Sequence, residues 1–206
     1  AIASYLIVPL STALVTALIS SYGQTAVAAY GLAGRLEAFI IVILMALGGA
    51  IAPYVGQNFG AKRFDRLEEG FKFSMRFILV NSVFCIVFLY FSAEFFLGFF
   101  TADPEVIKIA KMQLLYCPWG YGFLGVAAIC NGSFNAFGKP MPAMTISIAR
   151  TLVVYVPMAY LFASFIGIRG IFVAQVVANI LAGICCLYTS DAADEGLGVV
   201  IGGVRI

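Results

Sequence analysis

Long apolar runs alternate with short polar connections along most of the chain. A transmembrane helix needs about 20 predominantly apolar residues, and about six segments reach that length: residues 1–21, 36–57, 73–97, 114–137, 142–165 and 168–187. The predicted connections are residues 22–24 and 31–35, 62–72, 101–111, 138–140 and 167–170. The pattern predicts an all-α, polytopic membrane protein.

One connection also carries a helix-start signal. Asp103-Pro104-Glu105 combines a proline, tolerated in a first helical turn, with acids that favour the positive end of the helix dipole. We therefore expect a helix to begin there, as a short interfacial helix before the fourth span.

Composition supports a membrane environment. Of the 206 residues, 63% are hydrophobic and 11% charged, with a mean hydropathy of +1.03, whereas about a quarter of a soluble domain is charged. The lipid bilayer is thus the first expected partner. A net charge of +2 without a basic stripe argues against nucleic acid as another.

The residue inventory excludes several kinds of chemistry. The sequence has no His, which removes His-based triads, HExxH metal sites and imidazole relays. Its five cysteines lie in apolar runs without CxxC spacing, as expected for small, reduced, buried hydrophobes. The serines of the first span lack a nearby base. We expect no enzyme activity, no metal and no cofactor.

Basic residues predict the orientation. Six alternating crossings put one group on one side, namely Lys62, Arg63, Arg66, Lys72, Arg76 and Lys139. The other side receives Arg35, Lys108, Lys111 and Arg169. By the positive-inside rule the first side is cytoplasmic, which also places Ala1 near the cytoplasm.

The second span combines small residues with a proline and an amide near its end. Every fourth position is small, at Gly48, Ala52, Gly56 and Gly60, which predicts a close-packing face. Pro53 removes a backbone donor and loosens the helix, as a moving element requires. Gln57 is interpreted first as a helix-end hydrogen-bonding group and second as a substrate ligand.

The fourth span carries a polar face beside a second small-residue stripe. Tyr121, Asn131 and Asn135 lie roughly on one face, and the stripe consists of Ala128, Gly132 and Ala136. Neutral amides and aromatics suit bulky, weakly polar cations. Together with Gln57, these three polar residues are the candidates for lining a substrate cavity.

Charges inside spans are costly and usually functional. Arg35 and Glu37 are expected to snorkel to the interface. Arg150 lies about two turns from the predicted cytoplasmic end, so snorkelling and pairing with another helix both remain open. No acid lies in the middle of the first or fourth span, and no acid pair is predicted at membrane depth. The residues thus predict no proton or sodium relay here.

Several segments together resemble the multidrug and toxin extrusion (MATE) family. They are "AVAAYGLAGRLEAF", "GGAIAPYVGQNFGAKRFDRLEEG", "FTADPEVIKIA", "YGFLGVAAICNGSFNAFGKPMPA" and "ARTLVVYVPMAYLF", and the resemblance covers residues 1–187. It implies the carboxy-terminal six-helix lobe of a twelve-helix, pseudo-symmetric exporter in the cell membrane, without its amino-terminal lobe. The first, second and fourth helices would face a cavity between the lobes.

The resemblance also implies a function. Such an exporter exchanges amphipathic or cationic small molecules for H⁺ or Na⁺ by alternating access. The coupling acids that some members carry on the first and fourth helices of this lobe are not matched. We therefore expect the coupling site in the amino-terminal lobe, with a different coupling scheme as the alternative. Gating and packing would fall to Gly48, Ala52, Pro53, Gly56, Gly60 and Arg150. The alternatives are a lipid-linked saccharide flippase and a structural membrane protein without transport activity.

The last stretch departs from the membrane pattern. Residues 188–206 are small, acidic and Gly-rich, and "YTSDAADE" resembles a translated sequencing adapter. We expect a non-native or disordered tail there, with a flexible cytoplasmic tail as the alternative.

Overall fold

The computed structural model describes residues 2–138 and 140–197, with side-chain burial over 9–138 and 140–188, and it contains only helices over the described residues. In chain order they are α1 (Ile2–Ser20), α2 (Gln24–Gly60), α3 (Phe64–Phe100), α4 (Pro104–Tyr116), the 3₁₀ segment η1 (Cys117–Gly120), α5 (Tyr121–Ala136), α6 (Pro140–Ile148), the π-helical segment η2 (Ala149–Tyr155), α7 (Val156–Ile166) and α8 (Ile168–Leu197).

Five helical stretches are long and apolar enough to cross a membrane. They are Gln24–Gly60, Phe64–Phe100, Pro104–Ala136, Pro140–Ile166 and Ile168–Tyr188. The stretch Pro9–Ser20 of α1 is apolar but shorter. The third of these spans joins α4, η1 and α5, and the fourth joins α6, η2 and α7. The predicted all-α, polytopic fold is confirmed.

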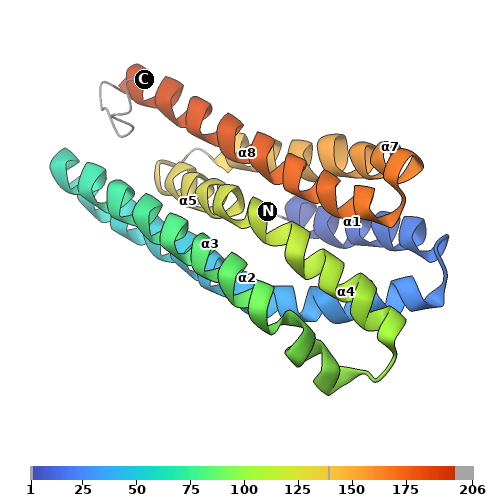
Figure 1. Cartoon of the computed structure of the whole chain (residues 1–206). Helices are drawn as coiled ribbons and strands as arrows, with labels where there is room; N and C mark the ends of the chain where they lie inside the picture. Colours follow the sequence, from blue (N-terminus) through green and yellow to red (C-terminus); the bar gives the residue numbers. More distant parts are fainter. Residues whose placement is uncertain (1, 139, 198–206) are drawn as a thin grey trace.

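Successive spans run in opposite directions. In Figure 1 the turns after α1, α3 and α7 lie at one end of the bundle, and the α2–α3 turn and the α5–α6 connection lie at the other. Lys62 and Gly138 therefore share an end, opposite Gly167, as the alternation of spans predicts. That the end near Lys62 is cytoplasmic stays a prediction.

Two predicted connections are wrong in extent. Residues 31–35, Gly-Leu-Ala-Gly-Arg, belong to α2, which begins at Gln24, because Ala26, Ala29 and Ala33 pack inward and hold the two glycines and Arg35 within the helix. The predicted loop 62–72 shrinks to residues 61–63, because α3 begins at Phe64. A helix can extend beyond its apolar segment into polar residues, and hydropathy alone does not predict where such a helix begins or ends.

The predicted helix start near Pro104 is confirmed. Asp103 Oδ1 accepts hydrogen bonds from the backbone amides of Glu105 and Val106 at 2.9 and 3.4 Å, satisfying donors that a helix start leaves open. The helix continues through η1 into α5, so the expected interfacial helix is the first part of the fourth predicted span. Trp119 of η1 points outward and is 63% exposed.

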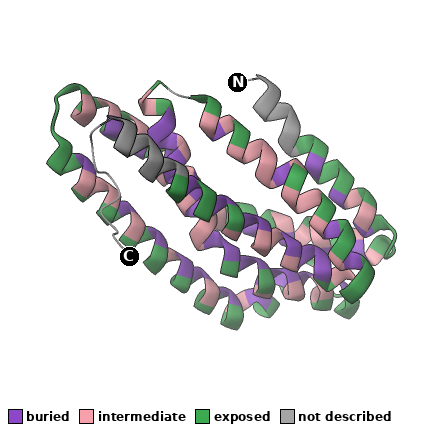
Figure 2. Cartoon of the chain, turned by 90° about the horizontal axis from the view of Figure 1, so that it is seen from above, coloured by how far each residue is buried: buried purple, intermediate pink, exposed green. Residues whose placement is uncertain are grey.

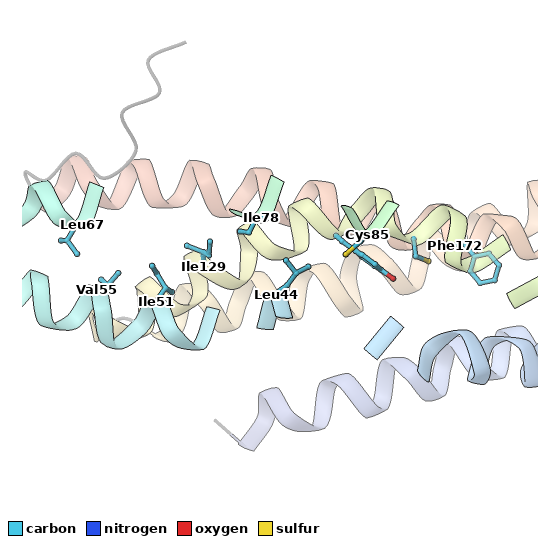
Figure 3. Packing of buried hydrophobic residues seen from close by; sticks show 10 residues of the cluster. Leu44, Ile51, Val55, Leu67, Ile78, Cys85, Ile129 and Phe172 are labelled. Carbon is cyan, nitrogen blue, oxygen red and sulfur yellow. The ribbon is translucent and has the colours of Figure 1, made fainter. Parts of the chain in front are cut away.

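One core cluster lies between α2, α3, α5 and α8, and others join α2 to α3 and α4, α1 and α2 to α7 and α8, and α5 to α6 and α8. In Figure 2 buried residues follow one side of each helix, and Figure 3 shows side chains from the four helices of the first cluster meeting. The labelled residues are Leu44, Ile51, Val55, Leu67, Ile78, Cys85, Ile129 and Phe172. Exposed Phe and Tyr side chains on the outer face of α3 suit contact with lipid.

Small residues let α2 and α5 approach closely at one place. A Cβ on Gly132 would clash with the Gly48 carbonyl oxygen, and a Cβ on Gly48 would stand 3.0 Å from the Ala128 Cβ. The packing prediction for these three residues is confirmed. Within the described residues nothing lies within 4 Å of a Cβ placed at Gly56 or Gly60, so close packing at these two positions stays a prediction.

The described helix α8 passes the predicted end of the last span. It continues to Leu197, while residues 198–206 lie outside the described residues. Nothing tests whether residues 188–206 form a native tail, so that expectation stays a prediction.

Candidate functional site

A carboxyl group lies inside the bundle at Glu37. Its residue is 6% exposed, so the prediction that Glu37 snorkels to the interface is wrong, whereas Arg35 is exposed. The physical reason is helical position: Glu37 lies on the same inward face as Ala33 and Leu44, four residues after the one and seven before the other. That this part of the chain holds no proton or sodium relay stays a prediction.

Three polar side chains from the next span surround Glu37. Gln113 of α4, Cys117 of η1 and Tyr121 of α5 lie beside its carboxyl group, and all three are at most 1% exposed. Because they are four residues apart, they lie on one face of the continuous α4–η1–α5 span, and this face packs against α2. We call Glu37 and these three residues the Glu37 cluster.

Several oxygen atoms in the Glu37 cluster lack partners. Glu37 Oε1, Gln113 Oε1 and the Tyr121 hydroxyl are buried without a hydrogen-bond partner among the described residues. Unpaired polar atoms are expensive in an apolar interior. Neutral and anionic oxygens are also the ligands that hard cations prefer, and a carboxyl group can take up a proton. The cluster can therefore bind and release H⁺ or a small cation.

A cavity of about 180 Å³ lies beside this cluster. We call it the Arg150 cavity, and it is lined by Ser11, Thr12, Tyr30, Arg150, Thr151, Tyr155, Gln175, Ala178 and Asn179. These residues come from α1, α2, η2 and α8. Tyr30 and Tyr155 are also electrostatic neighbours of Glu37, so they connect the cavity with the Glu37 cluster.

Among the described residues, Arg150 is held by an amide and not by an acid. Its Nη1 donates a hydrogen bond to Asn179 Oδ1 over 2.8 Å, and the ion pairs found over the described residues are Lys72–Glu68 and Lys111–Glu94. Of the two alternatives that the sequence left open, the structure shows pairing with a neighbouring helix.

The predicted cavity residues do not form one site. Tyr121 is 0% exposed and belongs to the Glu37 cluster, whereas Asn131 donates through Nδ2 to Ser147 Oγ over 3.3 Å. Asn135, Gln57 and Pro53 are exposed near the other end of the bundle. Substrate contact by any of these residues stays a prediction.

Sequence reasoning missed Tyr30, Gln113, Tyr155 and Asn179. Gln113 lies eight residues before Tyr121, a spacing that puts the two on one face of a helix. The fourth span was predicted to begin at residue 114, so Gln113 was placed outside it. Tyr155 had no such signal, because the π-helical segment η2 changes the register that regular helical spacing assumes.

The MatE family model matches residues 1–161. The chain belongs to the MatE family. A curated relative, the FAD transporter of Shewanella oneidensis, is 33% identical over 190 residues, which are 92% of this chain and 42% of the relative. The probable multidrug resistance protein YoeA of Bacillus subtilis is 27% identical over 160 residues, or 78% of this chain and 35% of that protein.

A solved structure extends this result to the fold. The Vibrio cholerae MATE transporter VcmN in its bent form matches with a TM-score of 0.87 and 32% identity, over 94% of this chain and 45% of VcmN. The chain therefore spans less than half the length of these relatives. The MATE resemblance is confirmed: this is a multi-pass membrane protein with the fold of part of a MATE transporter.

Proposed function

We propose that this MatE chain is the carboxy-terminal six-helix lobe of an efflux transporter for amphipathic small molecules. Cargo would leave by alternating access between this lobe and an amino-terminal lobe, driven by an H⁺ or Na⁺ gradient. Support comes from the multidrug resistance protein among its relatives and from the 45% of VcmN that the chain covers. Relatives that are transporters also weigh against the alternatives of a flippase and a structural protein.

One observation carries the proposal: a bundle with a lipid-facing exterior keeps the Glu37 cluster in its interior. An ionisable group within a membrane helix is expensive and usually marks a transport pathway. The oxygens of this cluster without hydrogen-bond partners do not help to hold the helices together, and they are available to bind an ion. We therefore assign Glu37 a part in ion coupling, beside the acid expected in the amino-terminal lobe.

Close packing suits movement of the lobe as one body. At Gly48 and Gly132 the backbones of α2 and α5 are in direct contact, and packed interfaces of this kind resist gradual deformation. Alternating access would then come from rocking of one lobe against the other, as in other transporters built from repeats.

A second cargo class is favoured by a specific observation. The relative with 33% identity is a FAD transporter, and FAD is an anionic molecule with aromatic rings. The Arg150 cavity offers a cation, two tyrosines and several hydroxyl and amide groups, which suit such a molecule better than they suit an organic cation. Export of an anionic, aromatic metabolite is therefore the alternative to export of cationic drugs.

The test is gradient-driven transport in proteoliposomes. The complete transporter, with both lobes, is reconstituted, and an H⁺ or Na⁺ gradient is imposed while the movement of ethidium and of FAD is followed by fluorescence. We expect at least one of the two to move only when a gradient is present. Absence of gradient-driven movement of both would contradict the proposed function.

A further inference from the structure

We propose that the Arg150 cavity is a binding subsite for the anionic group, a phosphate or carboxylate, of a transported solute. The inference rests on the proposed transport function and adds the chemical class of its cargo and the residues that recognise it. It follows from the depth, the pairing and the surroundings of one arginine.

Arg150 lies deep in its span. It is ten residues after Pro140, where α6 begins, and at 1.5 Å per residue this is about 15 Å along the helix axis. The span continues for sixteen residues beyond Arg150 to Ile166, or about 24 Å, so the Arg150 backbone lies well inside the span. A charge at this depth is costly and is kept where it has a partner or a function.

The pairing of Arg150 leaves its charge uncompensated. Asn179, which accepts a hydrogen bond from Arg150, is neutral, and no acid lines the cavity among the described residues. The titratable groups that interact electrostatically with Arg150 are Cys186 and Tyr155, and neither is a carboxylate. The guanidinium has further N–H donors in a planar fork that fits phosphate and carboxylate oxygens.

The remaining lining supplies neutral hydrogen-bonding groups. Hydroxyls come from Ser11, Thr12, Thr151, Tyr30 and Tyr155, and an amide comes from Gln175. The Tyr155 hydroxyl is buried without a hydrogen-bond partner among the described residues, although it lines this cavity. An anionic oxygen could accept from it and from Arg150 together.

The π-helical segment η2 places these groups. Arg150, Thr151 and Tyr155 all lie within it, and single π-turns in α-helices occur often at functional sites. Thr151 Oγ1 donates to the Ser147 carbonyl over 2.9 Å, so this hydroxyl is tied to the preceding turn. The segment thereby presents the guanidinium and a tyrosine to the same space.

The cavity volume limits what can bind. At 180 Å³ it holds a phosphate or carboxylate with a few waters, since each water occupies about 30 Å³. It is smaller than the roughly 300–1,000 Å³ of pockets for drug-sized ligands. The cavity therefore fits the charged end of a solute, whose remainder would lie outside it.

The test compares two flavins that differ by one phosphate group. FMN and riboflavin share their ring system, so quenching of their fluorescence by the complete transporter in phosphatidylcholine nanodiscs isolates the contribution of the phosphate. We expect FMN to bind about tenfold or more tightly than riboflavin, as a charge-assisted hydrogen bond predicts. Arg150→Gln should abolish this preference, and Arg150→Lys, which keeps the charge, should retain part of it.

Arg169→Gln is the matched control. It removes the same charge at an exposed position of α8 outside the cavity lining, and it should leave the preference for FMN unchanged. Equal affinities of the wild type for FMN and riboflavin would overturn the inference. So would an Arg150→Gln protein that still binds ethidium and retains the wild-type preference for FMN.

A lipid headgroup could offer the same phosphate chemistry, and a second arm distinguishes it. Nanodiscs that also contain phosphatidylglycerol should leave FMN binding unchanged if the site takes a solute. Displacement of FMN by this lipid, lost in Arg150→Gln, would assign the cavity to a headgroup and overturn the inference. Failure of the proposed function is seen separately, as absence of gradient-driven transport in the wild type.

Discussion

An acidic side chain, Glu37, and a basic one, Arg150, lie within the bundle, and the ion pairs found in the described residues do not include them. Tyr30 and Tyr155 stand between them, as residues of the Arg150 cavity and electrostatic neighbours of Glu37. Binding of cargo at Arg150 and of an ion at Glu37 would therefore act on the same two tyrosines.

Replacing Glu37 by Gln tests its part in coupling. The substitution keeps the size of the side chain and removes its ability to carry charge, so the helices should remain folded. We expect gradient-driven transport in proteoliposomes to fall at least about tenfold, the loss expected when a positioned acid is removed, while binding of cargo persists in the absence of a gradient.

Glu105→Gln is the matched control for this prediction. Glu105 is exposed in the first turn of α4, and its loss should leave transport unchanged. Full gradient-driven transport by the Glu37→Gln protein would show that the buried acid is structural.

At the scale of elements, small-residue spacing correctly predicted that Gly48 on α2 and Gly132 on α5 lie on close-packing faces. It could not predict that these two faces pack against each other, because spacing records which residues share a face and not which helix that face contacts. The η2 segment was also beyond prediction, since a π-turn adds a residue to one turn without a distinctive sequence. Hydropathy located the spans but missed the first 12 residues of α2, where glycines and a few polar residues accompany alanines that pack inward.

The α2–α5 contact predicts a difference between two glycines. Gly132→Ala should destabilise the protein by about 1–3 kcal/mol, the usual effect of overpacking, because its Cβ would clash with the Gly48 carbonyl oxygen. Gly56→Ala has open space and should stabilise α2 by about 0.5–1 kcal/mol through helix propensity.

Thermal unfolding in detergent, followed by circular dichroism, measures both changes. A midpoint for Gly132→Ala at or above that of the wild type would show that α2 and α5 do not touch as described. Gly56→Ala serves as the control, since it makes the same chemical change on one of the same two helices.

At the scale of the molecule, the sequence predicted a polytopic helical protein and its family correctly, because both depend on extended patterns. The interior site was only partly predictable: Arg150 was recognised as a charge within a span, and Glu37 was misplaced by a boundary error. Predicting the Arg150 cavity requires knowing that α1, α2, η2 and α8 converge, which is a property of tertiary packing.

The lobe hypothesis predicts that the described helices do not transport alone. Reconstituted without the rest of the transporter, they should bind FMN or ethidium weakly and show no gradient-driven movement of either. Addition of the amino-terminal lobe as a separate chain should restore transport, measured by the same fluorescence assay. Gradient-driven movement by these helices alone would contradict the two-lobe arrangement.

The position of Trp119 has a practical consequence. It is the single tryptophan of the sequence, it points out of the bundle, and it lies two residues from both Cys117 and Tyr121, which contact Glu37. Because η1 is the joint between α4 and α5, any bending there changes the depth of this indole in the bilayer. Quenching by lipids brominated at known depths would then report motion of the joint without an added label.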